Sequence, residues 1–337
     1  MRHSNQHYPS ESFPLLWNWY QSLLARQKQP VAASEKFLFE CIKALAHPKA
    51  EGARIWFSAM DSFFRDSTNA LVDFLNADEL SLSRKTPITE VLAALCENAI
   101  LAGEGRRALD YLKKFASQTN LSAIRFLSGW TALNIGDLEE CIEECEKDVE
   151  PTGPVYTLLG QALLESGRVE DAIEALIIAS KKAPSDPLAL VQLIKAYLVA
   201  KQPLNAIPPI ETCRLIVGLS EEIECLAAFV IIDTQDCHSD FARLTIDNLL
   251  TCFQQDKSNL DLLSLLFDVF KACNDQESAA RVFSSADYRC LAQRPDFLIK
   301  FGKFLRCSAE INWFRTAEII TSKLSAVTNQ NLQKYTI

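Results

Sequence analysis

Apolar residues recur at three- and four-residue spacing along almost the whole chain, which is the period of one face of an α-helix. The first such stripe contains Phe13, Leu16, Trp17, Tyr20 and Leu24. No strict alternation of apolar and polar residues runs past four positions, so the pattern gives no reason to expect β-strands. The chain is predicted to be all-α.

Glycine and proline interrupt this helical pattern roughly every 12 to 18 residues, which leaves room for helices of three to four turns. The interruptions are Gly103 and Gly105, Gly136, Pro151 and Gly153, Gly167, Pro184 and Pro187, and Pro203. Short links between helices of this length are typical of stacked antiparallel helix pairs.

One stretch, residues 153–186, has a more specific pattern of small and apolar positions. It contains Leu159, Gly160, Leu163, Gly167, Ala172, Leu176, Ala179 and Pro184. Small residues allow two helices to cross closely, and a glycine permits the left-handed turn that ends a helix. In residue type and spacing this stretch closely resembles a tetratricopeptide repeat.

Neighbouring stretches repeat this pattern less completely. Ala206 follows Ala172 by 34 residues, and Gly129 and Gly136 precede Gly160 and Gly167 by 31. Four units over about residues 89–219 carry the resemblance. It implies a right-handed superhelical solenoid of antiparallel helix pairs with helical caps. The predicted domains are an N-terminal helical cap (1–86), a tetratricopeptide-like array (87–219), a C-terminal lobe of degenerate helical repeats (220–327) and a tail (328–337).

Pro208 and Pro209 fall where the second helix of the fourth unit should lie. Proline removes a backbone donor and clashes with the preceding helical turn, but it is tolerated in the first turn. We therefore expect the helix to start at Pro208 and the superhelix to be broken near residues 203–209. The break could be a hinge between two lobes or a rigid kink.

Composition and charge exclude two classes of function, nucleic-acid binding and a membrane span. The 337 residues carry 34 Lys and Arg against 43 Asp and Glu, a formal charge of −9, with no obvious basic cluster. Such a surface repels phosphate backbones, so no nucleic-acid partner is expected. The longest apolar stretch, residues 225–232, is too short to span a membrane.

The 11 cysteines fit no disulfide framework. Most sit singly in apolar helical patterns, where a free cysteine behaves as a small hydrophobe. This set includes Cys41, Cys96, Cys213, Cys225, Cys252 and Cys273. Because the first residues also lack a secretory signal, we expect a reducing, cytoplasmic location.

No phosphate loop, nucleophile elbow or zinc-protease motif occurs, so we expect no enzyme, no catalytic residue and no cofactor. Cys141 and Cys145 lie one helical turn apart, but without two further ligands nearby they are expected in the core and not on a metal. Cys237 and His238 lack an identifiable orienting partner for catalysis.

An acidic run occupies residues 137–146. Acids near a helix start complement the helix dipole, and Glu143 and Lys147 have the spacing of an ion pair within one helix. The alternative is that the run docks a basic partner on the convex side.

The resemblance implies that the first helix of each unit lines a concave groove that holds a partner segment. The groove positions, unit by unit, are Ala93, Glu97 and Ile100; Phe126, Trp130 and Asn134; Thr157, Gln161 and Leu164; and Val191, Lys195 and Leu198. Family members that grip a C-terminal carboxylate use a clamp of Lys, Asn and Arg. Thr157, Gln161 and Val191 stand at the asparagine-type places, so that clamp is absent here.

Trp130 is the best candidate for a binding anchor, because a tryptophan offers a large apolar area and one donor. Its alternative role is packing against the neighbouring unit, and Phe126, one turn earlier, could extend the same platform. The expected binding set is Glu97, Phe126, Trp130, Asn134, Thr157, Gln161 and Lys195.

The implied function is a non-catalytic adaptor or scaffold that binds a protein or peptide partner in this groove. The alternative is a structural subunit of a larger assembly, with its flanks and convex face covered. Trp17 and Trp19 motivate the alternative, because one amphipathic helix cannot bury both against a single surface.

Overall fold

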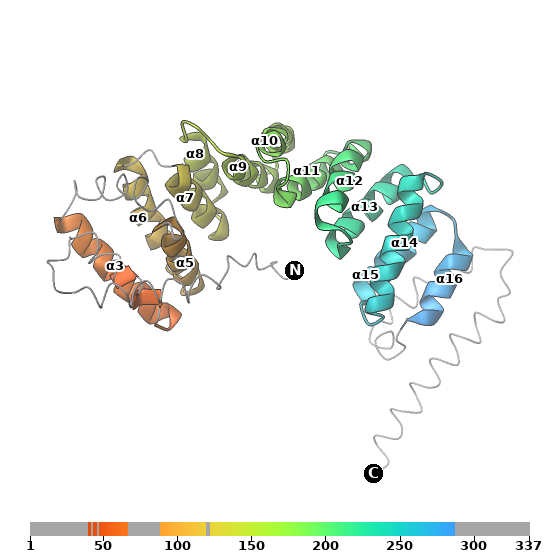
Figure 1. Cartoon of the computed structure of the whole chain (residues 1–337), viewed down its shortest axis with the longest axis horizontal. Coiled ribbons are helices and arrows are strands. Elements are labelled where there is room, and N and C mark those ends of the chain that lie inside the picture. The colour runs from red at the N-terminus through yellow and green to blue at the C-terminus, as the bar shows by residue number, and fades with distance from the viewer. Residues whose placement is uncertain (1–39, 42, 46, 67–87, 119–121, 287–337) are drawn as a thin grey trace, which may run out of the picture. The chain divides into compact units, whose positions relative to one another are not determined.

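A computed structural model describes residues 40–41, 43–45, 47–66, 88–118 and 122–286. Every regular element in these residues is helical, which confirms the all-α prediction (Figure 1). The chain divides into two compact units, residues 1–184 (unit 1) and 185–337 (unit 2). The stripe at residues 13–24, Trp17 and Trp19 included, and the stretch 328–337 lie outside the described residues.

Unit 1 consists of successive helices joined by short turns. They are α3 (Lys49–Asp66), α5 (Ile88–Leu101), α6 (Gly105–Gln118), α7 (Ser122–Asn134), α8 (Leu138–Glu146), α9 (Gly153–Glu165) and α10 (Val169–Lys182). From α5 on, each helix contacts the next, and α7 also contacts both α5 and α9. Helices α5, α7 and α9 therefore form one layer of the unit, which we call the inner layer.

Unit 2 repeats this arrangement. Its helices are α11 (Pro187–Val199), α12 (Ile207–Val217), α13 (Glu221–Thr234), α14 (Asp240–Gln255), α15 (Leu260–Ala272) and α16 (Gln276–Ser285). Here α13 contacts both α11 and α15, in addition to its chain neighbours. Each unit is thus a stack of helix pairs in which the first helices touch one another.

The helix start predicted near Pro208 is confirmed to within one residue. Residues Pro203–Ala206 form a short 3₁₀ helix, and α12 begins at Ile207, one residue before the expected Pro208. Pro208 and Pro209 therefore lie in the first turn of α12, where their missing donors cost no intrahelical bond. The break in the superhelix, as a hinge or a rigid kink, stays a prediction.

Close crossing of α9 and α10 depends on Gly160. A Cβ at this position would lie 2.4 Å from Leu176 Cγ, which no real side-chain contact allows. Gly160 and the fully buried Ala172 thus have the spacing role that the sequence predicted for them.

A residue with positive φ ends the first helix of every described pair. In unit 1 this residue is a glycine: Gly103, Gly136 or Gly167, with φ between 81° and 85°. In unit 2 it is Lys201, Gln235 or Asn274, with φ between 53° and 58°. The left-handed conformation lets the last carbonyl groups of the helix accept bonds from the turn.

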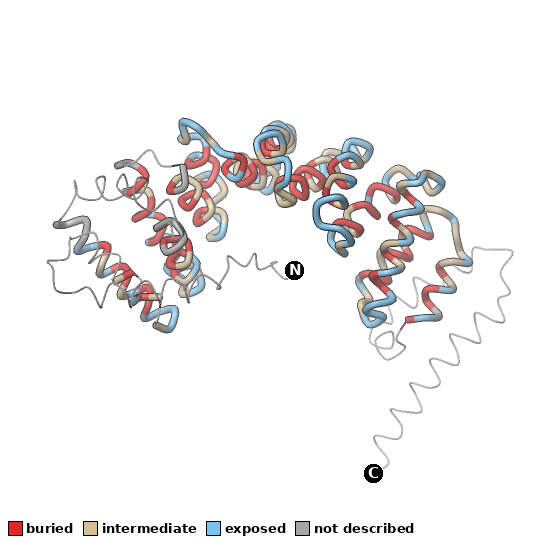
Figure 2. Tube along the Cα trace, in the orientation of Figure 1, coloured by how far each residue is buried: buried red, intermediate tan, exposed pale blue. Residues whose placement is uncertain are grey.

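The core runs along the facing sides of the helices (Figure 2). One cluster joins α3 to α5, α6 and α7, and includes Trp56, Phe57 and Phe115. A second joins α6 through α10. In unit 2, two clusters cover α11 to α13 and α13 to α16. Among the residues that the structure describes, no single core extends over a whole unit, as expected of stacked repeats.

Candidate partner-binding site

Trp130 lies on the inner helix α7 and is half-buried. Its side chain packs against both core clusters of unit 1, and so does that of Phe126 one turn earlier. Trp130 therefore has the packing role named as its alternative, and part of its ring also stays exposed. The packing role is thus observed, and the role as a binding anchor stays a prediction.

Polar side chains accompany these aromatics on the inner layer. The Asn134 side-chain amide donates to the carbonyl of Trp130 at 2.8 Å, which fixes its orientation and leaves its own oxygen as an acceptor. Gln161 on α9 donates to Glu165 at 3.0 Å. Glu97 on α5 is exposed. Glu97, Phe126, Trp130, Asn134 and Gln161 thus lie on adjacent inner helices of one unit.

Thr157 does not join this surface. It is only 3% exposed, and its hydroxyl donates to the carbonyl of Gly153 at 3.1 Å. Ala93 and Val191, also groove positions by resemblance, are buried as well. These positions belong to the core, so a partner does not reach them.

Lys195 lies in unit 2 and is described with that unit. Its ammonium group is 3.1 Å from Glu222 Oε1 on α13, so its charge is already compensated.

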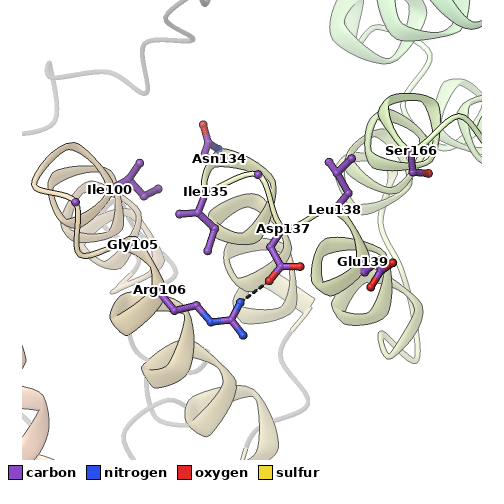
Figure 3. A pocket seen from close by; sticks show the side chains of 11 residues that line it. Ile100, Gly105, Arg106, Asn134, Ile135, Asp137, Leu138, Glu139 and Ser166 are labelled. Atoms are coloured by element: carbon purple, nitrogen blue, oxygen red, sulfur yellow. Dashed lines mark hydrogen bonds and ion pairs between the residues drawn. The ribbon is translucent and has the colours of Figure 1, made fainter.

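A pocket of about 780 Å³ opens beside the interhelix turns of unit 1 (Figure 3). We call it the turn-edge pocket. It is lined by Ile100, Gly103, Gly105, Arg106, Asn134, Ile135, Gly136, Asp137, Leu138, Glu139 and Ser166. Of these residues only Ile100 and Asn134 were predicted to bind a partner. The glycine spacing locates the turns in the sequence, but nothing in the sequence shows that three of them border one hollow.

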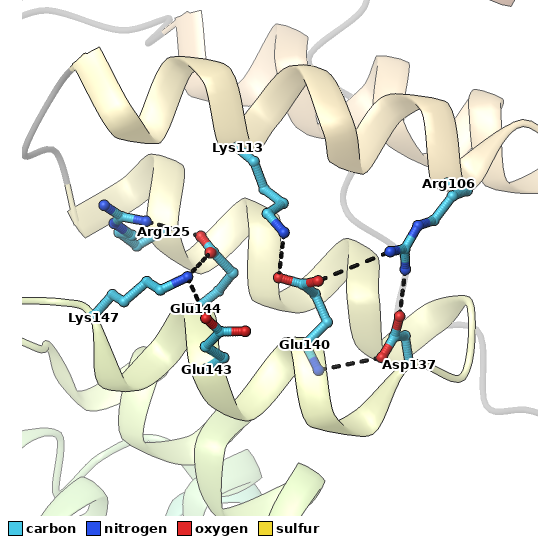
Figure 4. A network of polar contacts seen from close by, with 8 residues as sticks. All are labelled: Arg106, Lys113, Arg125, Asp137, Glu140, Glu143, Glu144 and Lys147. Carbon is cyan, nitrogen blue, oxygen red and sulfur yellow. Dashed lines mark hydrogen bonds and ion pairs between the residues drawn. The ribbon is translucent and has the colours of Figure 1, made fainter.

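Most acidic side chains of the run at residues 137–146 form contacts within unit 1 (Figure 4). Arg106 of α6 pairs with Asp137, and Lys113 of α6 lies 2.7 Å from Glu140. The buried Glu144 accepts from Arg125 of α7 at 3.0 Å. These contacts tie α8 to α6 and α7, so they serve the fold.

The predicted pair of Glu143 and Lys147 is confirmed at 2.8 Å. The contact lowers the pKa of the Glu143 carboxyl and raises the pKa of Lys147, since each charge favours the other. Glu139 and Glu146 are exposed acids of α8 that make no ion pair among the described residues. Of these two, Glu139 lines the turn-edge pocket.

The cysteine prediction needs one correction. Cys237 and Cys273 form a disulfide with Cα atoms 5.4 Å apart, although they are 36 residues apart in sequence. Cys237 lies in the α13–α14 turn and Cys273 caps α15, so stacking of the helix pairs brings together two turns that sequence spacing does not relate. Cys273 is therefore not a single core thiol.

The remaining described cysteines are free, and most are buried. Burial raises the pKa of Cys96 to about 12. The pKa of Cys145 is also raised, first by its hydrogen bond with Cys141 and then by burial. Cys141 and Cys145 both lie in the core, as expected. Across the described ranges, no group of three or more His, Cys, Asp or Glu side chains lies close enough to hold a metal ion.

Sequence comparison finds no matching family model and no curated relative. Solved structures do show similarity. The C-terminal part of a tetratricopeptide repeat protein from Cytophaga hutchinsonii aligns with 71% of this chain and 95% of its own, at 14% identity and a TM-score of 0.48. A tetratricopeptide repeat protein from Parabacteroides merdae aligns with 70% of this chain and 98% of its own, at 15% identity and a TM-score of 0.46.

The repeated inner-helix contacts, the recurring left-handed turn and the Gly160 crossing decide the fold type. The chain is a tetratricopeptide-like helical-repeat protein. YrrB, described as a tetratricopeptide protein with an unusual peptide-binding site, is also similar: it aligns with 58% of this chain at 13% identity and a TM-score of 0.43. No helix of this tetratricopeptide-like protein is, within the described residues, both long and apolar enough to cross a bilayer.

Proposed function

We propose that the protein is a non-catalytic adaptor or scaffold that holds a segment of a partner protein on the inner layer of unit 1. The observation that carries the proposal is Trp130, an aromatic side chain that is fixed by two core clusters and still partly exposed. A rigid aromatic loses little side-chain entropy on binding, and such residues are the usual anchors of protein interfaces.

The neighbouring residues fit this role. Phe126 packs against the same clusters and extends the apolar surface along α7. Asn134 and Gln161 are held by hydrogen bonds at 2.8 and 3.0 Å, so they present fixed polar groups to a partner. An apolar centre with a polar rim is the general anatomy of a protein interface.

The test is quantitative capture from native lysate with wild-type protein, Trp130→Ala and the control Leu215→Ala. Leu215 is 88% exposed in unit 2, so its loss removes apolar surface without disturbing the core. Truncation of a central anchor costs about 2 kcal/mol or more, which is roughly a thirtyfold loss of affinity. Partners that Trp130→Ala retains and Leu215→Ala loses would contradict the proposal.

A second candidate function is a permanent subunit of a larger assembly, and one observation favours it. Where α12 ends, Leu215, Ile216, Val217 and Leu219 are between 40% and 88% exposed. A contiguous apolar surface marks an interaction site more often than isolated apolar residues do. In the capture experiment, loss of partners with Leu215→Ala alone would support this candidate.

The cytoplasmic location stays a prediction. Disulfides are rare in that compartment, so the Cys237–Cys273 bond provides a direct check. Thiol trapping in cells, followed by mass spectrometry of the two peptides, reports whether the bond is formed where the protein resides.

A further inference from the structure

The turn-edge pocket of unit 1 has the chemistry of a second binding site, apart from Trp130. We propose that it binds a short extended peptide in which an aliphatic side chain is flanked by lysine or arginine. The two surfaces share Ile100 and Asn134, but binding in the pocket does not depend on a partner at Trp130.

An aliphatic side chain fits the pocket because apolar residues beside the α5–α6 and α7–α8 turns line it. Ile100 lies in the last turn of α5, while Ile135 and Leu138 flank the α7–α8 turn (Figure 3), and all three are half-buried. The site of a Cβ on Gly105 would be 2.5 Å from Ile135 Cγ2 and 3.1 Å from Ile100 Cγ1. The missing side chain of Gly105 thus lets both isoleucines approach the start of α6.

An extended peptide fits because backbone is uncovered beside these side chains. Gly103 and Gly136 line the pocket, and no atom lies within 4 Å of the place where either would carry a Cβ. The Asn134 side-chain oxygen, left as an acceptor by the bond from its own amide to Trp130, can receive a peptide N–H.

A positive charge on the peptide follows from the charges left in the pocket. Arg106 lines it, but its guanidinium pairs with Asp137 and approaches Glu140 at 3.9 Å. Glu139 makes no ion pair among the described residues. With Arg106 and Asp137 neutralising each other, Glu139 gives the pocket a net formal charge of −1, which attracts a cation and repels an acidic peptide.

The probe is the peptide acetyl-Gly-Lys-photoleucine-Lys-Gly-amide, crosslinked by light to the full-length protein and mapped by mass spectrometry. We expect crosslinks on residues 100–106 and 134–139. A peptide with Glu in place of both Lys residues should label these positions at least threefold less, because Glu139 then repels it.

Two variants and two controls make the result specific. Glu139→Arg should reduce labelling about threefold, and Leu138→Ser about fivefold, through loss of charge and of apolar contact. Glu146→Arg reverses another exposed, unpaired acid of α8 outside the pocket and should leave labelling unchanged. Trp130→Ala should also leave it unchanged. Circular dichroism and thermal melting confirm that each variant is folded.

The possible outcomes separate the two proposals. Labelling that is absent, independent of peptide charge, or insensitive to Leu138→Ser and Glu139→Arg overturns the pocket proposal. Labelling that Trp130→Ala removes while Leu138→Ser retains it places the peptide on the inner layer, which overturns the pocket proposal and supports the proposed function. Pocket labelling without any Trp130-dependent partner in lysate supports the pocket proposal and overturns the proposed function.

Discussion

The two units form the turn after the first helix of each pair with different residues in the left-handed position. In unit 1, Gly167 donates to Leu164 at 3.1 Å, and the next residue, Arg168, donates to Leu163 at 2.9 Å. In unit 2, Lys201 lies 34 residues later and donates to Leu198 at 3.1 Å, while Gln202 donates to Tyr197 at 2.9 Å. The hydrogen bonds are the same, although a left-handed conformation is costly for lysine and not for glycine.

Because the hydrogen bonds are equal and the residues differ, the packing of the helix pair, and not the turn residue, determines the conformation of the turn. A residue with a Cβ pays a conformational cost in this position, and contacts elsewhere in the unit must offset it. Unit 2 contains two such contacts that fasten its helices: a buried ion pair of Arg214 with Glu224, and the disulfide of Cys237 with Cys273. The stability of unit 2 is therefore expected to depend on both contacts.

The largest effect is expected from Glu224→Gln. Glu224 of α13 is fully buried, accepts from Arg214 Nε at 2.9 Å, and also accepts from Asn248 at 3.0 Å. Arg214 is 11% exposed, so loss of the carboxylate leaves a buried cation without its charge partner. We expect a loss of about 3–5 kcal/mol in the free energy of unfolding, measured in urea.

The matched change in unit 1 is Glu144→Gln. Glu144 is also buried, but its partners Arg125 and Lys147 have side chains that are 17% and 41% exposed and can turn to water. The cost should therefore be about half as large. Equal costs in the two units would contradict the view that burial of the arginine makes the difference.

An effect between those of Glu224→Gln and Glu144→Gln is expected when Cys237 and Cys273 are both replaced by serine. The disulfide closes a loop with a sequence separation of 36, so its removal should lower the free energy of unfolding by about 3 kcal/mol. Reductant should destabilise the wild-type protein by a similar amount and leave the double variant unchanged. A wild-type protein that is insensitive to reductant would rule out this contribution.

The smallest effect is expected from exchanging the turn residues. Gly167→Ala introduces a Cβ that meets no atom within 4 Å, so only the backbone cost appears, about 1 kcal/mol of destabilisation. Lys201→Gly should stabilise by about 0.5 kcal/mol, since it relieves that cost but loses the exposed contact of Lys201 with Asp233. Urea unfolding of both variants decides whether the two turns are equivalent.

Much of the fold could be predicted from the sequence, because short-range rules govern it. Gly160 and Gly167 stand out as small or left-handed positions, and Pro208 indicates a helix start. Lys201 and Gln235 give no such signal, because packing of the helix pair, and not local preference, places them in the left-handed region. Asn274 gives a weaker signal than glycine, since asparagine adopts this conformation more readily than other residues with a Cβ.

The candidate site was less predictable. Trp130 could be singled out by residue type, but only the structure shows that two clusters hold it. Thr157 was placed by resemblance, and its burial depends on how α9 packs. The turn-edge pocket and the Cys237–Cys273 bond both join residues from different turns, and no spacing within a single helix reports such a contact.

The disulfide also has a mechanical consequence. In a stack of helix pairs each pair is held by its neighbours, so a chain pulled from its ends unravels pair by pair. The residues between Cys237 and Cys273, which are 36 apart in sequence, cannot be stretched while the disulfide joins them. At about 3.4 Å per extended residue, the stretched chain is shorter by roughly 120 Å until the bond is reduced. Under load, the redox state of two cysteines thus sets how far unit 2 can lengthen.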